Sequence, residues 1–143
     1  EDVEEILNRQ IECNMAICRE GLEHPYGAEV GRILIDGNEK PTVGLKARAF
    51  AAAGSDARMN GCPMPVVINP EVVIRGSRSA CRSLFTRRRK TSKKKNFLRG
   101  LVVSNLIAVH QKKYIGSLSA YCGVVSAACG AACGTLLHAW ISI

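Results

Sequence analysis

The sequence predicts an all-α fold, a partial helical bundle with a disordered basic insert. Two observations carry this prediction. Apolar residues recur at steps of three and four before residue 61 and again after residue 96, which is the spacing of one helix face. Between these parts the chain follows neither the helical nor the strand period. The 143 residues therefore divide into 1–69, a basic segment 70–95, and 96–143.

The first expected helix covers residues 1–22. Its apolar stripe consists of Leu7, Ile11, Met15, Cys18 and Leu22. Gly21 and His24-Pro25 end this helix, because proline cannot continue it. Residues 29–35 form a short segment whose type the pattern does not decide, and a turn signature closes it at Asp36-Gly37-Asn38.

The second expected helix covers residues 42–60, and its small side chains permit close packing. It stops at Asn60-Gly61, after which Pro63 and Pro65 hold the backbone extended. We call residues 62–67 the strap. Cys62 lies on this strap. Arg58, one turn earlier, is expected to face solvent or to meet an anion.

Two further helices are expected over 97–113 and 117–137. Residues 114–137 carry no charge, and this length is sufficient to cross a bilayer. Small and hydroxyl side chains dominate it, however, so we interpret it as a buried helix of a bundle. Cys129 and Cys133 share a helix face with Cys122. We expect them to pack as small residues rather than to hold a metal.

The net charge of +8 comes from one segment. Residues 70–95 contain ten Lys or Arg and one acid, Glu71. A small basic protein that binds nucleic acid or a membrane is therefore the alternative function. No recognised nucleic-acid motif accompanies the charge, so we expect no specific nucleic acid and no membrane as partners.

Cysteine usage bears on the cellular compartment. The chain has seven cysteines and no export signal at its start, which predicts a reducing, cytoplasmic location. It begins with Glu1 inside an expected helix, so we also expect residues before it.

Several separated motifs occur in order along the chain: Asn8-Arg9-Gln10-Ile11, His24-Pro25-Tyr26-Gly27, Ser55-Asp56-Ala57-Arg58-Met59, Gly61-Cys62-Pro63 and the run from Tyr114 to Gly123. Together they resemble the alpha chain of the iron–sulfur L-serine dehydratase family, and most closely its single-chain relatives, which include L-cysteine desulfidase. The resemblance implies β-elimination from L-serine to pyruvate and ammonia, or from L-cysteine to pyruvate, ammonia and sulfide.

The resemblance also implies a [4Fe–4S] cluster. In the family, three cysteines hold the cluster and one open iron draws away the leaving group. Cys122, in Ala-Tyr-Cys-Gly, matches one of these ligands and is the candidate cofactor-binding and metal residue. The other two ligands fall outside this chain in the family pattern. No residue is assigned a catalytic role.

The resemblance stops after Asn69-Pro70 and resumes near Lys95. The family carries a Gly-Ser-Gly-Asn-Gln-Gly loop there, whose amides suit a substrate carboxylate. Codons permitted for Pro70 to Arg78 spell that loop when they are read in another frame, which indicates a frameshift. We therefore expect a fragment that neither assembles the cluster nor catalyses the reaction, while its classification as an enzyme stays open.

Overall fold

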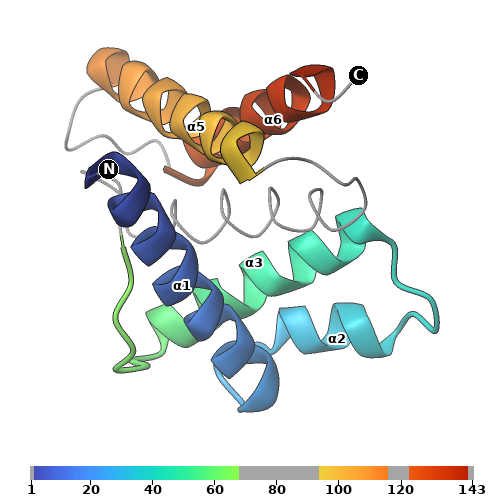
Figure 1. The fold of residues 1–143 in the computed structure, drawn as a ribbon. Coiled ribbons are helices and arrows are strands. Elements are labelled where there is room, and N and C mark those ends of the chain that lie inside the picture. Colours follow the sequence, from blue (N-terminus) through green and yellow to red (C-terminus); the bar gives the residue numbers. More distant parts are fainter. Residues whose placement is uncertain (1, 68–93, 116–122, 142–143) are drawn as a thin grey trace.

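The computed structural model describes residues 2–67, 94–115 and 123–141, and these residues form helices without a strand (Figure 1). The helices are α1 (Asp2–Glu23), α2 (Val30–Asp36), α3 (Val43–Met59), α5 (Lys94–Ile115) and α6 (Gly123–Ile141). The predicted all-α class is confirmed. The undecided segment 29–35 is the short helix α2.

The helix boundaries differ from the prediction mainly in the second half of the chain. Lys94 and Lys95 belong to α5, although the sequence predicted them in the disordered segment. Helix α6 continues to Ile141, four residues past the expected end at 137. The rest of the basic segment lies outside the described residues, so its predicted disorder stays a prediction.

Helices α1, α2 and α3 pack on one another, and α5 packs on α6 (Figure 1). Helix α3 begins at a capped residue, because the hydroxyl oxygen of Thr42 accepts from the N–H of Leu45 at 3.2 Å. It ends at Asn60, whose N–H and Nδ2 both donate to the carbonyl of Asp56. Both ends of α3 are therefore set by local hydrogen bonds.

The buried face of α1 differs from the predicted stripe. Leu7, Met15 and Cys18 are buried as expected, whereas Ile11 and Leu22 are half-buried. The inward positions also include two amides and a β-branched residue, Gln10, Asn14 and Ile17. The reason is that α1 contacts α5 as well as α3, so its buried face is wider than one apolar stripe.

Helices α5 and α6 approach each other through glycine. A Cβ at Gly130 would lie 2.5 Å from the carbonyl oxygen of Ser104, and one at Gly134 would meet the carbonyl of Gly100. The predicted small-residue packing is thus carried by glycines. Cys129 is exposed, so the expectation that it packs with Cys133 on a buried face is wrong for Cys129.

Hydropathy along the described helices tests whether any of them could span a membrane. None of these helices is both long and apolar enough to cross a membrane.

Candidate functional site

The strap begins with a turn at the end of α3. Gly61 has a φ of 85°, in the left-handed region that favours glycine. The N–H of Cys62 donates to the carbonyl of Ala57 at 3.0 Å, which directs the chain back over the end of α3. Cys62 is 3% exposed and packs in one cluster with Ile17 and Ala57. The turn therefore puts a buried thiol at the contact between α1 and α3.

Asn14 on α1 fixes the far end of the strap. Its Nδ2 donates to the carbonyl of Val67 at 2.9 Å, and its Oδ1 accepts from the N–H of Val67 at 3.0 Å. One side-chain amide thus makes the two hydrogen bonds that a facing strand residue would make. Asn14 is 1% exposed, so both bonds are shielded from water. An unpaired backbone group there would be costly.

Tyr26 connects the strap with the loop that follows α1. Its ring packs against the cluster that contains Cys62, and its O–H donates to Oε1 of Glu20 at 3.3 Å. The same oxygen lies 3.0 Å from Nδ1 of His24. We call Cys62, Tyr26, Glu20 and His24 the Tyr26 cluster. It runs from a buried thiol to an imidazole whose side chain is 59% exposed.

The Tyr26 cluster keeps its phenol protonated. Hydrogen bonding with Cys62 is the largest cause that raises the pKa of Tyr26 to about 12, and burial and the Glu20 carboxylate act in the same direction. Removing a proton from Tyr26 would create a negative charge beside Glu20. At neutral pH Tyr26 is therefore a hydrogen-bond donor and not a base.

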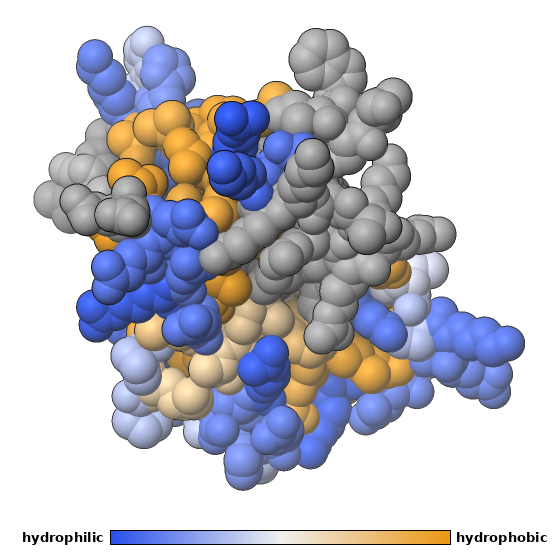
Figure 2. Space-filling view, in the orientation of Figure 1, coloured by the Kyte–Doolittle hydropathy of each residue, from blue (hydrophilic) through white to orange (hydrophobic). Residues whose placement is uncertain are grey.

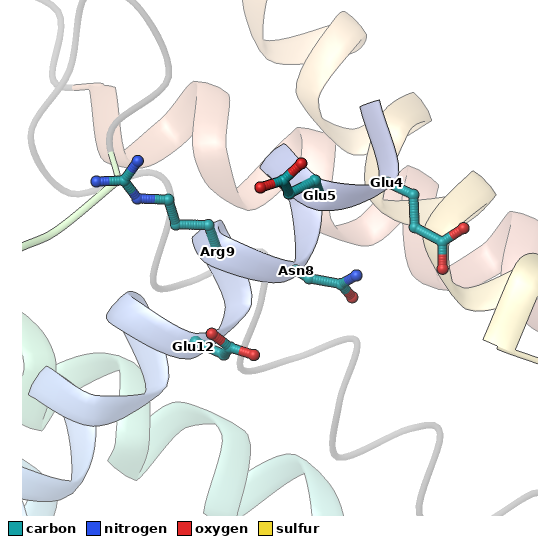
Figure 3. Close-up of a pocket in the computed structure, with 5 residues that line it drawn as sticks. All are labelled: Glu4, Glu5, Asn8, Arg9 and Glu12. Atoms are coloured by element: carbon teal, nitrogen blue, oxygen red, sulfur yellow. The ribbon is translucent and has the colours of Figure 1, made fainter. Parts of the chain in front are cut away.

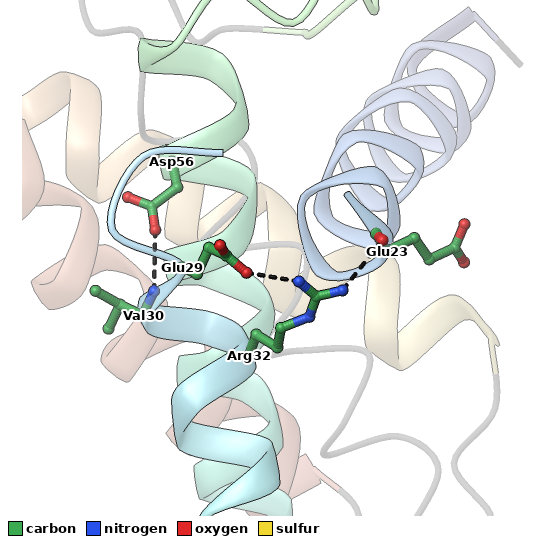
Figure 4. A network of polar contacts seen from close by, with 5 residues as sticks. All are labelled: Glu23, Glu29, Val30, Arg32 and Asp56. Atoms are coloured by element: carbon green, nitrogen blue, oxygen red, sulfur yellow. Dashed lines mark hydrogen bonds and ion pairs between the residues drawn. The ribbon is translucent and has the colours of Figure 1, made fainter. Parts of the chain in front are cut away.

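A second polar network holds the loop after α1 against α3 (Figure 4). Oδ2 of Asp56 accepts from the N–H of Val30 at 3.2 Å, which satisfies a backbone donor at the start of α2. Arg32 pairs with Glu29 at 2.6 Å and donates to the carbonyl of Glu23 at 3.3 Å. Asp56, the carboxylate of the Ser55–Met59 motif, therefore has a structural role, because it binds the start of α2.

Gly27 brings two of the motifs that carried the family resemblance into contact. It has a φ of 58°, and a Cβ there would lie 2.5 Å from Nδ2 of Asn60. A larger residue would meet both the backbone strain and this amide. The His24–Gly27 loop thus lies against the end of α3 because glycine occupies position 27.

Two buried side-chain donors among the described residues have no hydrogen-bond partner. They are Nε of Arg58 and Nε2 of Gln10. Arg58 was predicted to face solvent or to meet an anion, and it is half-buried. Gln10 is 2% exposed, and its Oε1 accepts from Nδ2 of Asn105 on α5 at 3.1 Å. Buried N–H groups are nearly always paired in folded proteins, so these two donors are exceptions among the described residues.

The predicted cluster ligand, Cys122, lies outside the described residues. The cysteines that are described form no disulfide; they are Cys13, Cys18, Cys62, Cys129 and Cys133. Within residues 2–67, 94–115 and 123–141, no three His, Cys, Asp or Glu side chains could hold a metal ion. A [4Fe–4S] cluster held by three cysteines does not fit these side chains.

Sequence reasoning missed the two amides of α1 and the role of Glu20. Gln10 and Asn14 are four residues apart and keep helical register with the buried Leu7 and Cys18. That register is a usable signal, because a polar pair on an inward helix face needs buried partners. Glu20 gave no comparable signal, since its partners come from the loop that follows the helix.

Comparison with known proteins gives one family. The profile of the serine dehydratase alpha chain matches residues 1–139. A UPF0597 protein of Desulfitobacterium hafniense is 48% identical over 136 residues, which cover 94% of this chain and 31% of that protein. A UPF0597 protein of Lachnoclostridium phytofermentans is 47% identical over 136 residues, with 94% and 32% covered.

The matches cover only part of each relative. The chain spans about a third of the length of the curated relatives it matches. No solved structure matches it.

Proposed function

Because the chain belongs to the serine dehydratase alpha-chain family, we propose that it is part of a cytoplasmic lyase domain that acts on a small amino acid. The reaction is β-elimination from L-serine or L-cysteine. It gives pyruvate and ammonia, with sulfide as a further product from cysteine. The chain as it stands does not complete this reaction alone.

The observation that carries this proposal is the meeting of three family motifs at one place. The loop His24–Gly27 contacts the end of α3, and the strap brings Cys62 to Tyr26. Residues that are far apart in the sequence thus form the Tyr26 cluster. Hydrogen-bonded groups that lead from a buried thiol to an exposed imidazole favour a site where protons are held or moved, which a β-elimination requires.

The Tyr26 cluster supplies a hydrogen-bond donor at neutral pH. The Tyr26 O–H is held by Glu20, and Glu20 in turn meets the exposed His24. Tyr26, Glu20 and His24 thus connect the buried thiol of Cys62 to solvent. Its part in the reaction is to hold a proton near the strap, because a phenol with a pKa of about 12 does not release one readily.

Cys122 is proposed as one ligand of the family's [4Fe–4S] cluster. The described side chains do not fit such a cluster, so its other ligands must come from residues outside them. We therefore derive no step of the reaction through the cluster. We expect the 143-residue chain alone not to assemble it.

The test is anaerobic reconstitution with iron and sulfide, followed by a pyruvate assay with L-serine and with L-cysteine. Two proteins are compared. One is the 143-residue chain. The other is a joined protein in which the frame between 70 and 95 is restored and the flanking parts of the Desulfitobacterium hafniense relative are attached.

We expect pyruvate from the joined protein and none from the chain alone. Replacing Cys122→Ala in the joined protein should remove both the cluster absorbance and the activity. Pyruvate formation by the chain alone that is lost on Cys122→Ala would contradict the proposed inactivity. A joined protein that binds the cluster and eliminates neither substrate would contradict the proposed reaction.

A further inference from the structure

The outer face of α1 is a solvated polar surface. Hydrophilic side chains gather over this helix in the space-filling view (Figure 2). An open pocket of about 500 Å³ on the same helix is lined by Glu4, Glu5, Asn8, Arg9 and Glu12 (Figure 3). The four charged residues are exposed, so water and salt screen them and they constrain the rest of the chain weakly. The carboxylate of Asp56 on α3 is placed differently, because it is half-buried and binds another segment.

The loop that carries Tyr26 is a tight and strained turn. The N–H of Glu29 donates to the carbonyl of Tyr26 at 3.2 Å, so these two residues are the ends of the turn. Gly27 between them has a φ of 58°, which glycine adopts readily. Glu29 has a φ of 51°, which is unfavourable for a residue with a Cβ. Such a conformation persists only when neighbouring groups hold it.

Asp56 contacts this turn on both sides of Glu29. After Glu29, Oδ2 of Asp56 accepts from the N–H of Val30 at 3.2 Å (Figure 4). Before Glu29, a Cβ at Gly27 would lie 3.5 Å from Cγ of Asp56, so the carboxylate also lies beside the backbone that follows Tyr26. One side chain of α3 thus holds the strained part of the turn by its backbone.

Arg32 contacts the same turn in a different way. Its guanidinium pairs with the side chain of Glu29 and donates to the carbonyl of Glu23, which precedes the loop (Figure 4). The side chain of Arg32 is 41% exposed, and ion pairs at such exposure hold their surroundings weakly. We therefore expect the backbone contact of Asp56, rather than the ion pair of Arg32, to fix the position of the turn.

The contacts of the Tyr26 side chain are sensitive to that position. Its O–H reaches Glu20 at 3.3 Å, whereas such bonds are usually about 2.7 to 2.8 Å long. The ring packs against the cluster that contains Cys62. A small displacement of the turn would break the long hydrogen bond and move the ring away from the thiol.

We propose that Asp56 is a positioning residue for the Tyr26 cluster: by binding the backbone of the turn, it keeps the Tyr26 side chain between Glu20 and Cys62. The inference deepens the proposed function and rests on it, because the Tyr26 cluster is the part of this chain proposed to hold a proton for the reaction. If Asp56 served only to cap α2, its loss would loosen that helix and leave Tyr26 where it is.

The experiment compares Asp56→Ala with Asp56→Asn in the 143-residue chain. Alanine removes the acceptor, whereas asparagine removes the charge and keeps an oxygen that can accept from Val30. Arg32→Gln is the matched control, because it breaks the ion pair with Glu29 and leaves the Asp56 contact in place. All proteins also carry Tyr114→Phe and Tyr121→Phe, so that tyrosinate absorbance reports Tyr26 alone.

Asp56→Ala should lower the pKa of Tyr26 from about 12 to below about 11, because the phenol moves away from Cys62 and Glu20. Cys62 and Glu20 raise this pKa and Asp56 is not among its causes, so the change would report a displaced side chain and not a lost charge. Asp56→Asn and Arg32→Gln should keep the pKa near 12. An unchanged pKa in Asp56→Ala, or an equal decrease in Arg32→Gln, would overturn the proposal.

A second readout at neutral pH stands even if alkali unfolds the chain before Tyr26 titrates. Nuclear Overhauser effects between the Tyr26 ring and the methyl groups of Ile17 and Ala57 report the packing of the ring on the Cys62 cluster. They should be lost in Asp56→Ala and kept in Asp56→Asn and Arg32→Gln. Their persistence in Asp56→Ala would overturn the proposal.

Circular dichroism shows whether Asp56→Ala folds. If it does not, Asp56→Ser is the milder change, because its hydroxyl is a shorter acceptor than the carboxylate. The same nuclear Overhauser effects should then be weaker than in Asp56→Asn, and equal intensities would overturn the proposal. Neither readout depends on pyruvate formation, so the proposed reaction and the role of Asp56 can fail separately.

Discussion

Helices α1 to α3 and the pair α5–α6 are held together in different ways. In the first region, side chains bind backbone groups, as the buried amide of Asn14 does at Val67 and the half-buried carboxylate of Asp56 does at Val30. In the second, backbones approach through Gly130 and Gly134. The first region also has close backbone approaches, at Gly21 and Gly31, but it adds specific polar partners to them. Loss of a polar partner should therefore act on the first region, whereas added side-chain volume should disturb either region.

The largest expected effect is that of a side chain added between α5 and α6. Gly134→Val should destabilise the chain by about 3 kcal/mol or more, because its Cβ meets the carbonyl of Gly100 and the backbone cannot move aside cheaply. Chemical denaturation followed by circular dichroism measures this. Gly44→Ala is the control, since a Cβ there meets nothing within 4 Å. An unchanged midpoint for Gly134→Val would show that the second region is not closely packed.

In the first region, Asn14→Leu should cost about 2 to 4 kcal/mol, because it leaves the N–H and the carbonyl of Val67 without partners. Gln10→Leu is the matched comparison one turn earlier. It should cost about 1 kcal/mol or less, since Nε2 of Gln10 is already unpaired and only the bond from Asn105 is lost. The same denaturation experiment serves both. Equal losses in the free energy of unfolding would contradict the expectation that the hydrogen-bonded amide of Asn14 stabilises the fold more than the partly unpaired amide of Gln10.

A smaller effect concerns the pH dependence of the first region. The pKa of Tyr26 is raised to about 12 in the folded protein from an ordinary value near 10. The folded state holds this proton more tightly than the unfolded state. Its stabilising effect is therefore complete below about pH 10 and is lost as the pH rises toward about 12.

Cys62→Ala should lower the pKa of Tyr26 toward its ordinary value, because it removes the largest cause of the shift. Tyrosinate absorbance during an alkaline titration measures this. Tyr114→Phe and Tyr121→Phe in both proteins remove the other tyrosines. If Cys62→Ala left the pKa of Tyr26 unchanged, the thiol would not be the cause of the raised pKa.

The smallest expected effect concerns the basic segment between the two regions. Any DNA binding should be weak, should fall steeply with salt, and should come from Arg75 to Lys95. Retention on immobilised DNA at physiological salt, with and without residues 71–95, measures this. Undiminished retention after the deletion would locate the basic surface in one of the two helical regions and would support the alternative function.

The fold was largely predictable from the sequence because its helices carry their own signals. Thr42 and Asn60 delimit α3 by short-range hydrogen bonds, and the apolar residues of α1 recur at helical spacing along its length. The contacts of the candidate site were less predictable. Asn14 and Val67 are 53 residues apart, and Gln10 and Asn105 are 95 apart. Pairings over such separations leave no local pattern, so only the motif positions themselves indicated where a site would form.

The two hydrogen bonds from Asn14 also determine the alignment of the strap. The side-chain amide needs one residue that offers both an N–H and a carbonyl, and Val67 does so. If the strap slid by two residues, Pro65 would stand opposite Asn14 and could donate nothing. If it slid by one, the side chains of the strap would turn to the other face. Asn14 and Pro65 together therefore fix the register of the strap and keep Cys62 beside Tyr26.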